Sequence, residues 1–131
     1  MPQQPEAKFK HALTEAFEIV SPTGFHAYTK ALGQNGLPDL RFAVAGLGGA
    51  WVEVKVGKNG LSKIQARCVD RMRAAGEVVV VLSFDNPTCT DKKAHIFTVR
   101  RGHAALPAVF VGREALRSTS FWACILSGVL P

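Results

Sequence analysis

The feature that most limits how this chain can fold is a run of five consecutive apolar residues, Val78 to Leu82. A strand without alternating polar positions is typical of the centre of a sheet that is covered on both faces. Helices are the elements that usually cover such a strand. The run therefore predicts a central strand that other elements cover on both faces.

Periodicity elsewhere predicts the order α-β-β-β-α-β over about residues 6–82. In the first helix Phe9, Leu13 and Phe17 recur at intervals of four and form an amphipathic stripe. Ser62 opens the second helix and Gly76 closes it. The apolar face expected for that second helix consists of Leu61, Ile64, Cys68 and Met72. The expected helices span residues 6–19 and 62–75, and the expected strands span residues 25–29, 37–44, 50–56 and 77–82.

The chain has 131 residues, 47% of them hydrophobic, which is the size of one domain with one core. We expect a single domain over residues 1–131, with a motif-bearing core at about 6–82 and a C-terminal extension at about 84–131. The extension is expected to contain strands at 94–99 and 108–111, a basic turn at 100–103 and a helix at 112–127. Its apolar segment 121–126 fits either a core helix or a symmetric interface.

Neither a membrane span nor a secretory signal is expected. The longest apolar stretch, residues 121–130, is too short to cross a bilayer, and residues 1–10 lack an apolar segment. The three cysteines are odd in number and far apart, at positions 68, 89 and 124. This usage fits a reduced, cytoplasmic protein better than a disulfide framework.

The chain is basic, with 16 Lys and Arg against 10 Asp and Glu and a formal charge of +6. A polyanion such as nucleic acid is the natural partner for such a chain, although many basic proteins are merely soluble. Basic residues gather at the second helix, where they contact phosphates or form a solvated helix face, and in the turn near residue 100. They are Lys58, Lys63, Arg67, Arg71 and Arg73 in the first group, and Arg100 and Arg101 in the second.

Two carboxylates and an ammonium are expected on one face of the hairpin. A loop at residues 45–49 pairs Val44 with Ala50 and places Asp39 opposite Lys55, and any even register keeps Asp39, Glu53 and Lys55 on one face. Such a cluster is costly to bury without a cation. Mg²⁺ takes one or two carboxylates together with water and phosphate oxygens, and Mn²⁺ accepts the same ligands. Taken separately, a Pro-Asp turn and a Glu-x-Lys strand are common surface features.

In combination and in this order, the motifs resemble the PD-(D/E)XK nuclease superfamily, and most closely its VRR-NUC branch. The resemblance covers about residues 6 to 82. It implies a restriction-endonuclease-like α/β core, in which helices flank a central mixed β-sheet, and metal-dependent hydrolysis of DNA phosphodiesters. The residues that carry it are Glu6-x-x-Phe9, Gly36-x-Pro38-Asp39-Leu40, Trp51-Val52-Glu53-Val54-Lys55 and Leu61-Ser62-x-x-Gln65.

The resemblance also implies roles for individual residues. Asp39 and Glu53 look like the metal-binding carboxylates, with the main-chain carbonyl of Val54 as a further ligand. Lys55 resembles the catalytic lysine. Gln65 matches a glutamine near the metal and the scissile phosphate, although Ser62-x-x-Gln65 is also a helix capping box. Glu6 is preferred as the first-helix glutamate, with Glu15 and Glu18 as rivals.

The function predicted from this reasoning is a Mg²⁺-dependent DNA endonuclease. By resemblance, it is a homodimer selective for branched DNA such as four-way (Holliday) junctions and acts in a bacterial cell or a phage-infected host. A nucleotide cofactor is not expected, because the glycines at 46–49 precede a strand and no Walker pattern exists. The alternatives are a non-catalytic nucleic-acid-binding module with the same fold and a restriction-type, sequence-specific endonuclease.

Overall fold

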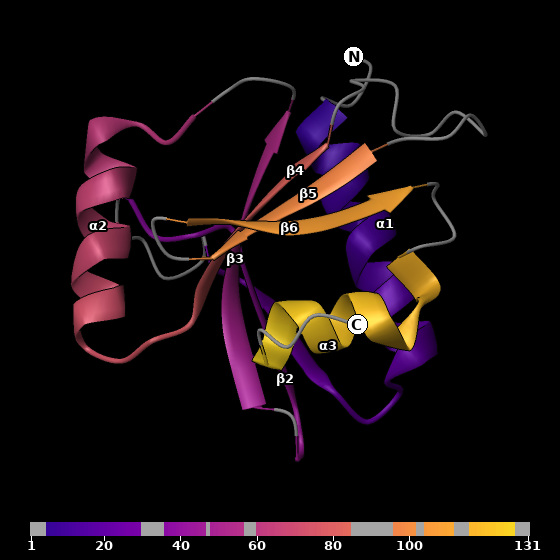
Figure 1. The fold of residues 1–131 in the computed structure, drawn as a ribbon. Helices are drawn as coiled ribbons and strands as arrows, with labels where there is room; N and C mark the ends of the chain where they lie inside the picture. The colour runs from indigo at the N-terminus through magenta and orange to yellow at the C-terminus, as the bar shows by residue number, and fades with distance from the viewer. Residues whose placement is uncertain are drawn as a thin grey trace.

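The computed structural model describes residues 5–29, 36–46, 48–56, 60–84, 96–101, 104–111 and 116–127. Nine helices and strands follow one another along these ranges (Figure 1). The helices are α1 (Pro5–Val20), α2 (Lys63–Ala74) and α3 (Thr119–Ser127). The strands are β1 (Phe25–Tyr28), β2 (Leu40–Val44), β3 (Gly48–Val56), β4 (Val79–Phe84), β5 (Ile96–Arg101) and β6 (Ala104–Val111).

The six strands form one mixed sheet in the order of the sequence, β1-β2-β3-β4-β5-β6. Strands β3 and β4 pair in parallel, and the other neighbours pair antiparallel. The parallel pair requires a crossover, which α2 supplies. Helix α2 lies on one side of the sheet, and α1 and α3 lie on the other (Figure 1). The expected α/β architecture, a central mixed sheet flanked by helices, is confirmed.

The hydrophobic core lies between the sheet and the pair α1 and α3. Alternating residues of β2 and β3, among them Phe42, Val52 and Val54, are fully buried on this face. The stripe predicted for the first helix covers them, since Phe9, Leu13 and Phe17 are at most 1% exposed. Burying a side chain of this size contributes roughly 1.5 to 3 kcal/mol relative to leaving it exposed. This face therefore supplies most of the core, which leaves the opposite face free to carry polar side chains.

Helix α3 belongs to the same core. Its residues Phe121, Trp122 and Ile125 are at most 2% exposed, and the Trp122 ring centroid lies 4.8 Å from that of Phe17. The indole Nε1 donates a hydrogen bond to the Leu116 carbonyl at 2.7 Å. Of the two readings of residues 121–126, the core helix is therefore the one that the structure supports.

The hairpin register differs from the predicted one by two residues. Val44 pairs with Gly48 instead of Ala50, so that Arg41 lies opposite Trp51. The turn is shorter because Gly46 and Gly48 adopt positive φ angles of 85° and 90°, which glycine tolerates without strain. The slip is even, so every side chain keeps its predicted face.

Two further expectations about the chain after residue 84 are corrected. Arg100 and Arg101 lie within β5, paired with Ala105 and Ala104, and the expected basic turn does not begin there. The pairing with β6 continues past Val99 through a register shift, which carries β5 two residues further than its sequence pattern indicates. The last helix begins at Thr119 and not at residue 112.

The prediction for α2 is correct at its ends and wrong for its apolar face. Ser62 caps the helix with a complete capping box, and Gly76 follows it at φ 91°. Val69 is the residue of this helix that is fully buried, whereas Ile64 is 61% exposed. The expected apolar stripe therefore does not pack into a core. Within the described residues, no helix is long and apolar enough to cross a membrane.

Candidate active site

Asp39 and Glu53 meet on the face of the sheet that α2 covers. Asp39 immediately precedes β2, and continuing the β2–β3 register from Leu40 and Val52 brings it opposite Glu53. The Asp39 backbone N–H donates to Glu53 Oε2 at 3.1 Å. The Val54 N–H donates to Asp39 Oδ2, also at 3.1 Å. Both residues are buried, and each carboxylate accepts a hydrogen bond from the backbone beside the other.

The turn before β2 is fixed by a residue that the sequence did not single out. Thr29 is buried, and its hydroxyl donates a hydrogen bond to the Pro38 carbonyl. Its backbone N–H donates to the Asp39 carbonyl at 3.0 Å. Thr29 therefore positions the Pro-Asp segment through hydrogen bonds that leave the Asp39 carboxylate available.

Lys55 and Gln65 complete the cluster around Glu53. The Lys55 Nζ lies 3.4 Å from Glu53 Oε1 and donates to Gln65 Oε1 at 3.0 Å. The Gln65 Nε2 donates to the same Glu53 oxygen at 2.9 Å. Gln65 Oε1 also accepts the Ser62 N–H at 3.0 Å, as a capping box requires. The capping contact and the contacts with the site, which the sequence offered as alternatives, are both present.

Lys10 belongs to the site and was missed by the sequence analysis. Its Nζ lies 3.0 Å from Asp39 Oδ1, and both side chains are nearly buried, at 12% and 11% exposure. No motif marks this lysine, because the resemblance concerns Glu6 and Phe9 in the same helix. A weak signal existed in its position, one helical turn after Glu6.

The electrostatics of the cluster are dominated by burial. The pKa of Glu53 is raised from 4.5 to about 7, first by burial and then by the nearby Asp39 carboxylate, and Lys55 opposes both effects. Near neutral pH the carboxyl of Glu53 therefore still binds a proton part of the time. Additional positive charge near this buried carboxyl group would stabilise its ionised form.

The donor set fits a hard divalent cation. Among the described residues, no group of three or more His, Cys, Asp and Glu side chains is arranged to hold a metal. The cluster instead offers the carboxylates of Asp39 and Glu53. Mg²⁺ commonly binds through one or two carboxylates and fills its other positions with water and phosphate oxygens. The pair fits that pattern, and it does not fit a closed structural site such as those of zinc.

The structure does not bring the rival glutamates to this cluster. Glu15 pairs with His11 and Glu18 pairs with His26, at 3.0 and 2.9 Å, on exposed parts of the chain. The preferred residue, Glu6, lies in the first turn of α1, and its side chain is outside the described part of the structure.

The expected DNA contacts divide into three groups. Lys63, Arg67 and Arg71 are exposed on α2. Arg73, in contrast, donates from Nη2 to the Val79 carbonyl at 3.1 Å, so it ties α2 to β4 and is not available for a phosphate. Lys58 and the side chains of Arg100 and Arg101 lie outside the described residues.

Comparisons were made with protein-family models, with curated proteins and with solved structures, and none of the three finds a match. Inferences about function therefore depend on the geometry of the site and on the sequence motifs.

Proposed function

We propose that this chain is a Mg²⁺-dependent DNA endonuclease with a restriction-endonuclease-like core of the VRR-NUC type. The observation that carries the proposal is the pair Asp39 and Glu53, held by each other's strands, with Lys55 and Gln65 in contact with Glu53. These residue types stand in the order that the nuclease motif requires. The strand register puts Asp39, Glu53 and Lys55 on one face of the sheet, and Gln65 reaches Glu53 from α2.

In this proposal Asp39 and Glu53, with the main-chain carbonyl of Val54, hold Mg²⁺, and Mn²⁺ substitutes for it. The bound cation supplies a lowered pKa for its water and charge stabilisation for the phosphate. Lys55 is kept in place by its hydrogen bond to Gln65 and by Glu53, so its ammonium is oriented before substrate arrives. There it donates a hydrogen bond to the attacking water and balances the negative charge that develops on the phosphate. Gln65 holds the Lys55 ammonium and the Glu53 carboxylate in place through one hydrogen bond to each.

The substrate is proposed from charge and from the resemblance. The formal charge of +6 and the exposed Lys63 and Arg67, on the same helix as Gln65, support a phosphodiester backbone as ligand. Selectivity for branched DNA such as four-way junctions, a homodimer, and a cytoplasmic site of action in a bacterial cell or phage-infected host are proposed from the resemblance alone. A homodimer would require a surface other than the buried face of α3.

A second candidate is favoured by one observation. The Lys10 ammonium, 3.0 Å from Asp39 Oδ1, neutralises part of the carboxylate pair without a metal. A structural network of this kind suits a non-catalytic DNA-binding module. The two candidates differ in whether the protein cleaves DNA when a divalent cation is present.

The deciding experiment is a cleavage assay on matched linear duplex, flap and four-way-junction DNA with Mg²⁺, Mn²⁺ or EDTA. We expect cleavage that requires the cation, is abolished in Asp39→Asn and falls about a hundred-fold or more in Lys55→Ala. Asp70→Asn, which removes an exposed carboxylate from α2, is the matched control and retains activity. If the wild-type protein binds these DNAs but cuts none of them, the non-catalytic module is the better account.

A further inference from the structure

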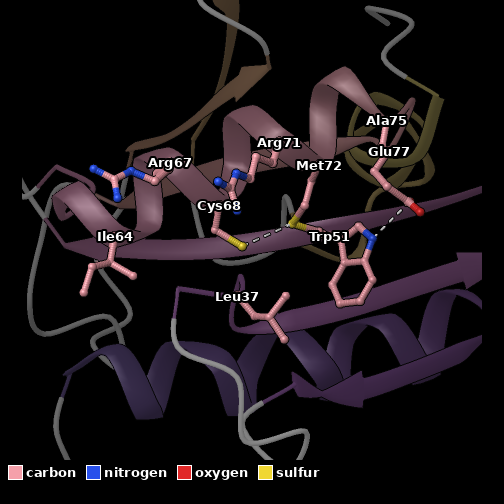
Figure 2. Close-up of a pocket in the computed structure, with 9 residues that line it drawn as sticks. All are labelled: Leu37, Trp51, Ile64, Arg67, Cys68, Arg71, Met72, Ala75 and Glu77. Carbon is pink, nitrogen blue, oxygen red and sulfur yellow. Dashed lines mark hydrogen bonds between the residues drawn. The ribbon is translucent and has the colours of Figure 1, made fainter.

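A groove of about 480 Å³ lies between α2 and the face of the sheet that carries the candidate site (Figure 2). Its apolar lining includes Leu37, Trp51, Cys68 and Met72, and Arg67, Arg71 and Glu77 add charged groups. Figure 2 shows Cys68 and Met72 reaching from α2 toward the space that Leu37 and Trp51 border. Three residues of the expected apolar face of α2, Ile64, Cys68 and Met72, thus line a groove whose volume is in the range of small-ligand pockets.

The groove adjoins the carboxylate cluster. Trp51 and Glu53 are two residues apart on β3 and face the same side, about 7 Å from each other along the strand. On α2, Cys68 follows Gln65 by three residues, or roughly one turn. A ligand in the groove and a phosphate at the cluster would therefore be neighbours.

Trp51 is held in a fixed orientation. Its Nε1 donates to Glu77 Oε2 at 3.1 Å, and the Arg41 guanidinium carbon lies 5.0 Å from the centre of its ring. A tryptophan restrained on two sides loses little freedom when another ring stacks on it. At the edge of the groove Trp51 therefore offers an aromatic ring whose orientation is already fixed.

The charges around this surface indicate what it binds. Arg67 and Arg71 are exposed and four residues apart, so they share one side of α2 and present two cations. The Glu77 carboxylate is 48% exposed and retains the capacity to accept further hydrogen bonds, for example from N–H groups of a base. An apolar slot with a stacking ring, a hydrogen-bond acceptor and two arginines matches a nucleotide: a planar base attached to a phosphate.

We propose that this groove binds one unpaired nucleobase of the DNA, stacked on Trp51, with the flanking phosphates on Arg67 and Arg71. The position of the scissile phosphate beside it rests on the proposed nuclease function, whereas binding of the base does not. Fully paired DNA offers no free base to the groove. The substrate class is therefore DNA that carries an unpaired or readily unstacked nucleotide next to the bond that is cut.

The test compares two duplexes of equal length and charge, in EDTA so that no cleavage occurs. One carries a single unpaired thymidine, and the other carries an unpaired abasic analogue at the same position. We expect wild-type protein to bind the thymidine duplex about ten-fold more tightly by fluorescence anisotropy. Trp51→Ala removes this preference and Trp51→Phe restores part of it. Arg117→Ala removes an exposed arginine next to the core-facing α3 and keeps the preference.

A second measurement uses wild-type protein and so does not depend on the folding of a variant. Cys68 lines the groove, whereas Cys124 is buried. We expect the thymidine duplex to slow alkylation of Cys68 by iodoacetamide, as followed by peptide mass spectrometry, and the abasic duplex to have little effect.

Equal binding of the two duplexes, with equal reactivity of Cys68, overturns the proposal and leaves the groove to a peptide or a second copy of the chain. A preference for the thymidine duplex in EDTA supports base binding in the groove, whether or not DNA is cut with Mg²⁺. Absence of cleavage with Mg²⁺ then contradicts only the nuclease function. Cleavage without any preference for the thymidine duplex overturns base binding in the groove and supports the nuclease function.

Discussion

Replacing Glu53 with glutamine removes the one carboxyl among the described residues whose pKa is shifted to about 7. Glutamine has nearly the same shape but keeps one acceptor oxygen, so it can accept from Gln65 Nε2 or from the Asp39 N–H and not from both. The substitution adds a fixed change in stability that does not depend on pH. What it removes is a pH-dependent contribution, and that contribution can be predicted in sign and size.

The sign follows from the direction of the shift. The pKa of Glu53 is about 7 in the folded protein and 4.5 in the unfolded chain, so between these values the folded state binds the additional proton. The free energy of unfolding therefore contains a favourable contribution that is fully present below about pH 4.5 and is lost as the pH rises through about 7. The whole shift corresponds to about 3 kcal/mol, most of which is lost between about pH 5 and about pH 8.

The assay is urea denaturation of wild type and Glu53→Gln in EDTA at about pH 5 and at about pH 8. We expect wild type to lose roughly 2 to 3 kcal/mol more than the variant when the pH is raised. Asp70→Asn, the exposed-carboxylate control, follows wild type. Saturating Mg²⁺ should remove most of the difference, because a cation favours the ionised carboxylate. Parallel pH dependence of wild type and Glu53→Gln would refute the account of the buried carboxylate.

Three further predictions concern the residues around the site. Lys10→Met leaves the nearly buried Asp39 carboxylate without its cation and should lower the free energy of unfolding by about 3 kcal/mol in urea titrations. Mg²⁺ should restore part of this loss. Unchanged stability would show that the ion pair contributes nothing. Gln65→Ala should lower both stability and the cleavage rate. Ser62→Ala, which removes only the capping hydroxyl, should cost about 1 kcal/mol of stability and leave the cleavage rate unchanged. Equal cleavage rates for the two variants would show that Gln65 acts only as a capping residue. Gly36→Ala should destabilise by about 2 kcal/mol or more in thermal unfolding, because φ is +87° and the new methyl group would lie 3.0 Å from a backbone oxygen of α2. Gly46→Ala, with φ +85° and no atom within 4 Å, is its control and should lose only the smaller backbone contribution.

Strand parity explains why part of the site could be predicted from the sequence. Residues two apart in a strand share a face, so Glu53 and Lys55 had to lie together once β3 was recognised. The hairpin register was predicted two residues away from its true value, yet Asp39 still reached the same face because the error was even. Gln65 was indicated by the resemblance to the nuclease motif, and the capping motif fixed where α2 begins.

The residues that the sequence could not place depend on how elements pack against one another. Lys10 reaches Asp39 because of the position of α1 across the sheet, and no local pattern encodes that position. The face of α2 was misassigned for the same reason: apolar spacing shows that Ile64, Cys68 and Met72 share a side but not what that side meets. Strand β5 ends two residues later and β6 begins four residues earlier than their patterns indicate, because their pairing with each other sets these ends.

The central claim is that Asp39 and Glu53 form a divalent-cation site, and Mn²⁺ binding followed by electron paramagnetic resonance tests it most directly. The account predicts that wild-type protein binds Mn²⁺, that Mg²⁺ displaces it, and that Asp39→Asn loses the binding while Asp70→Asn keeps it. Absence of Mn²⁺ binding to folded wild type, or equal binding to Asp39→Asn, would contradict the claim.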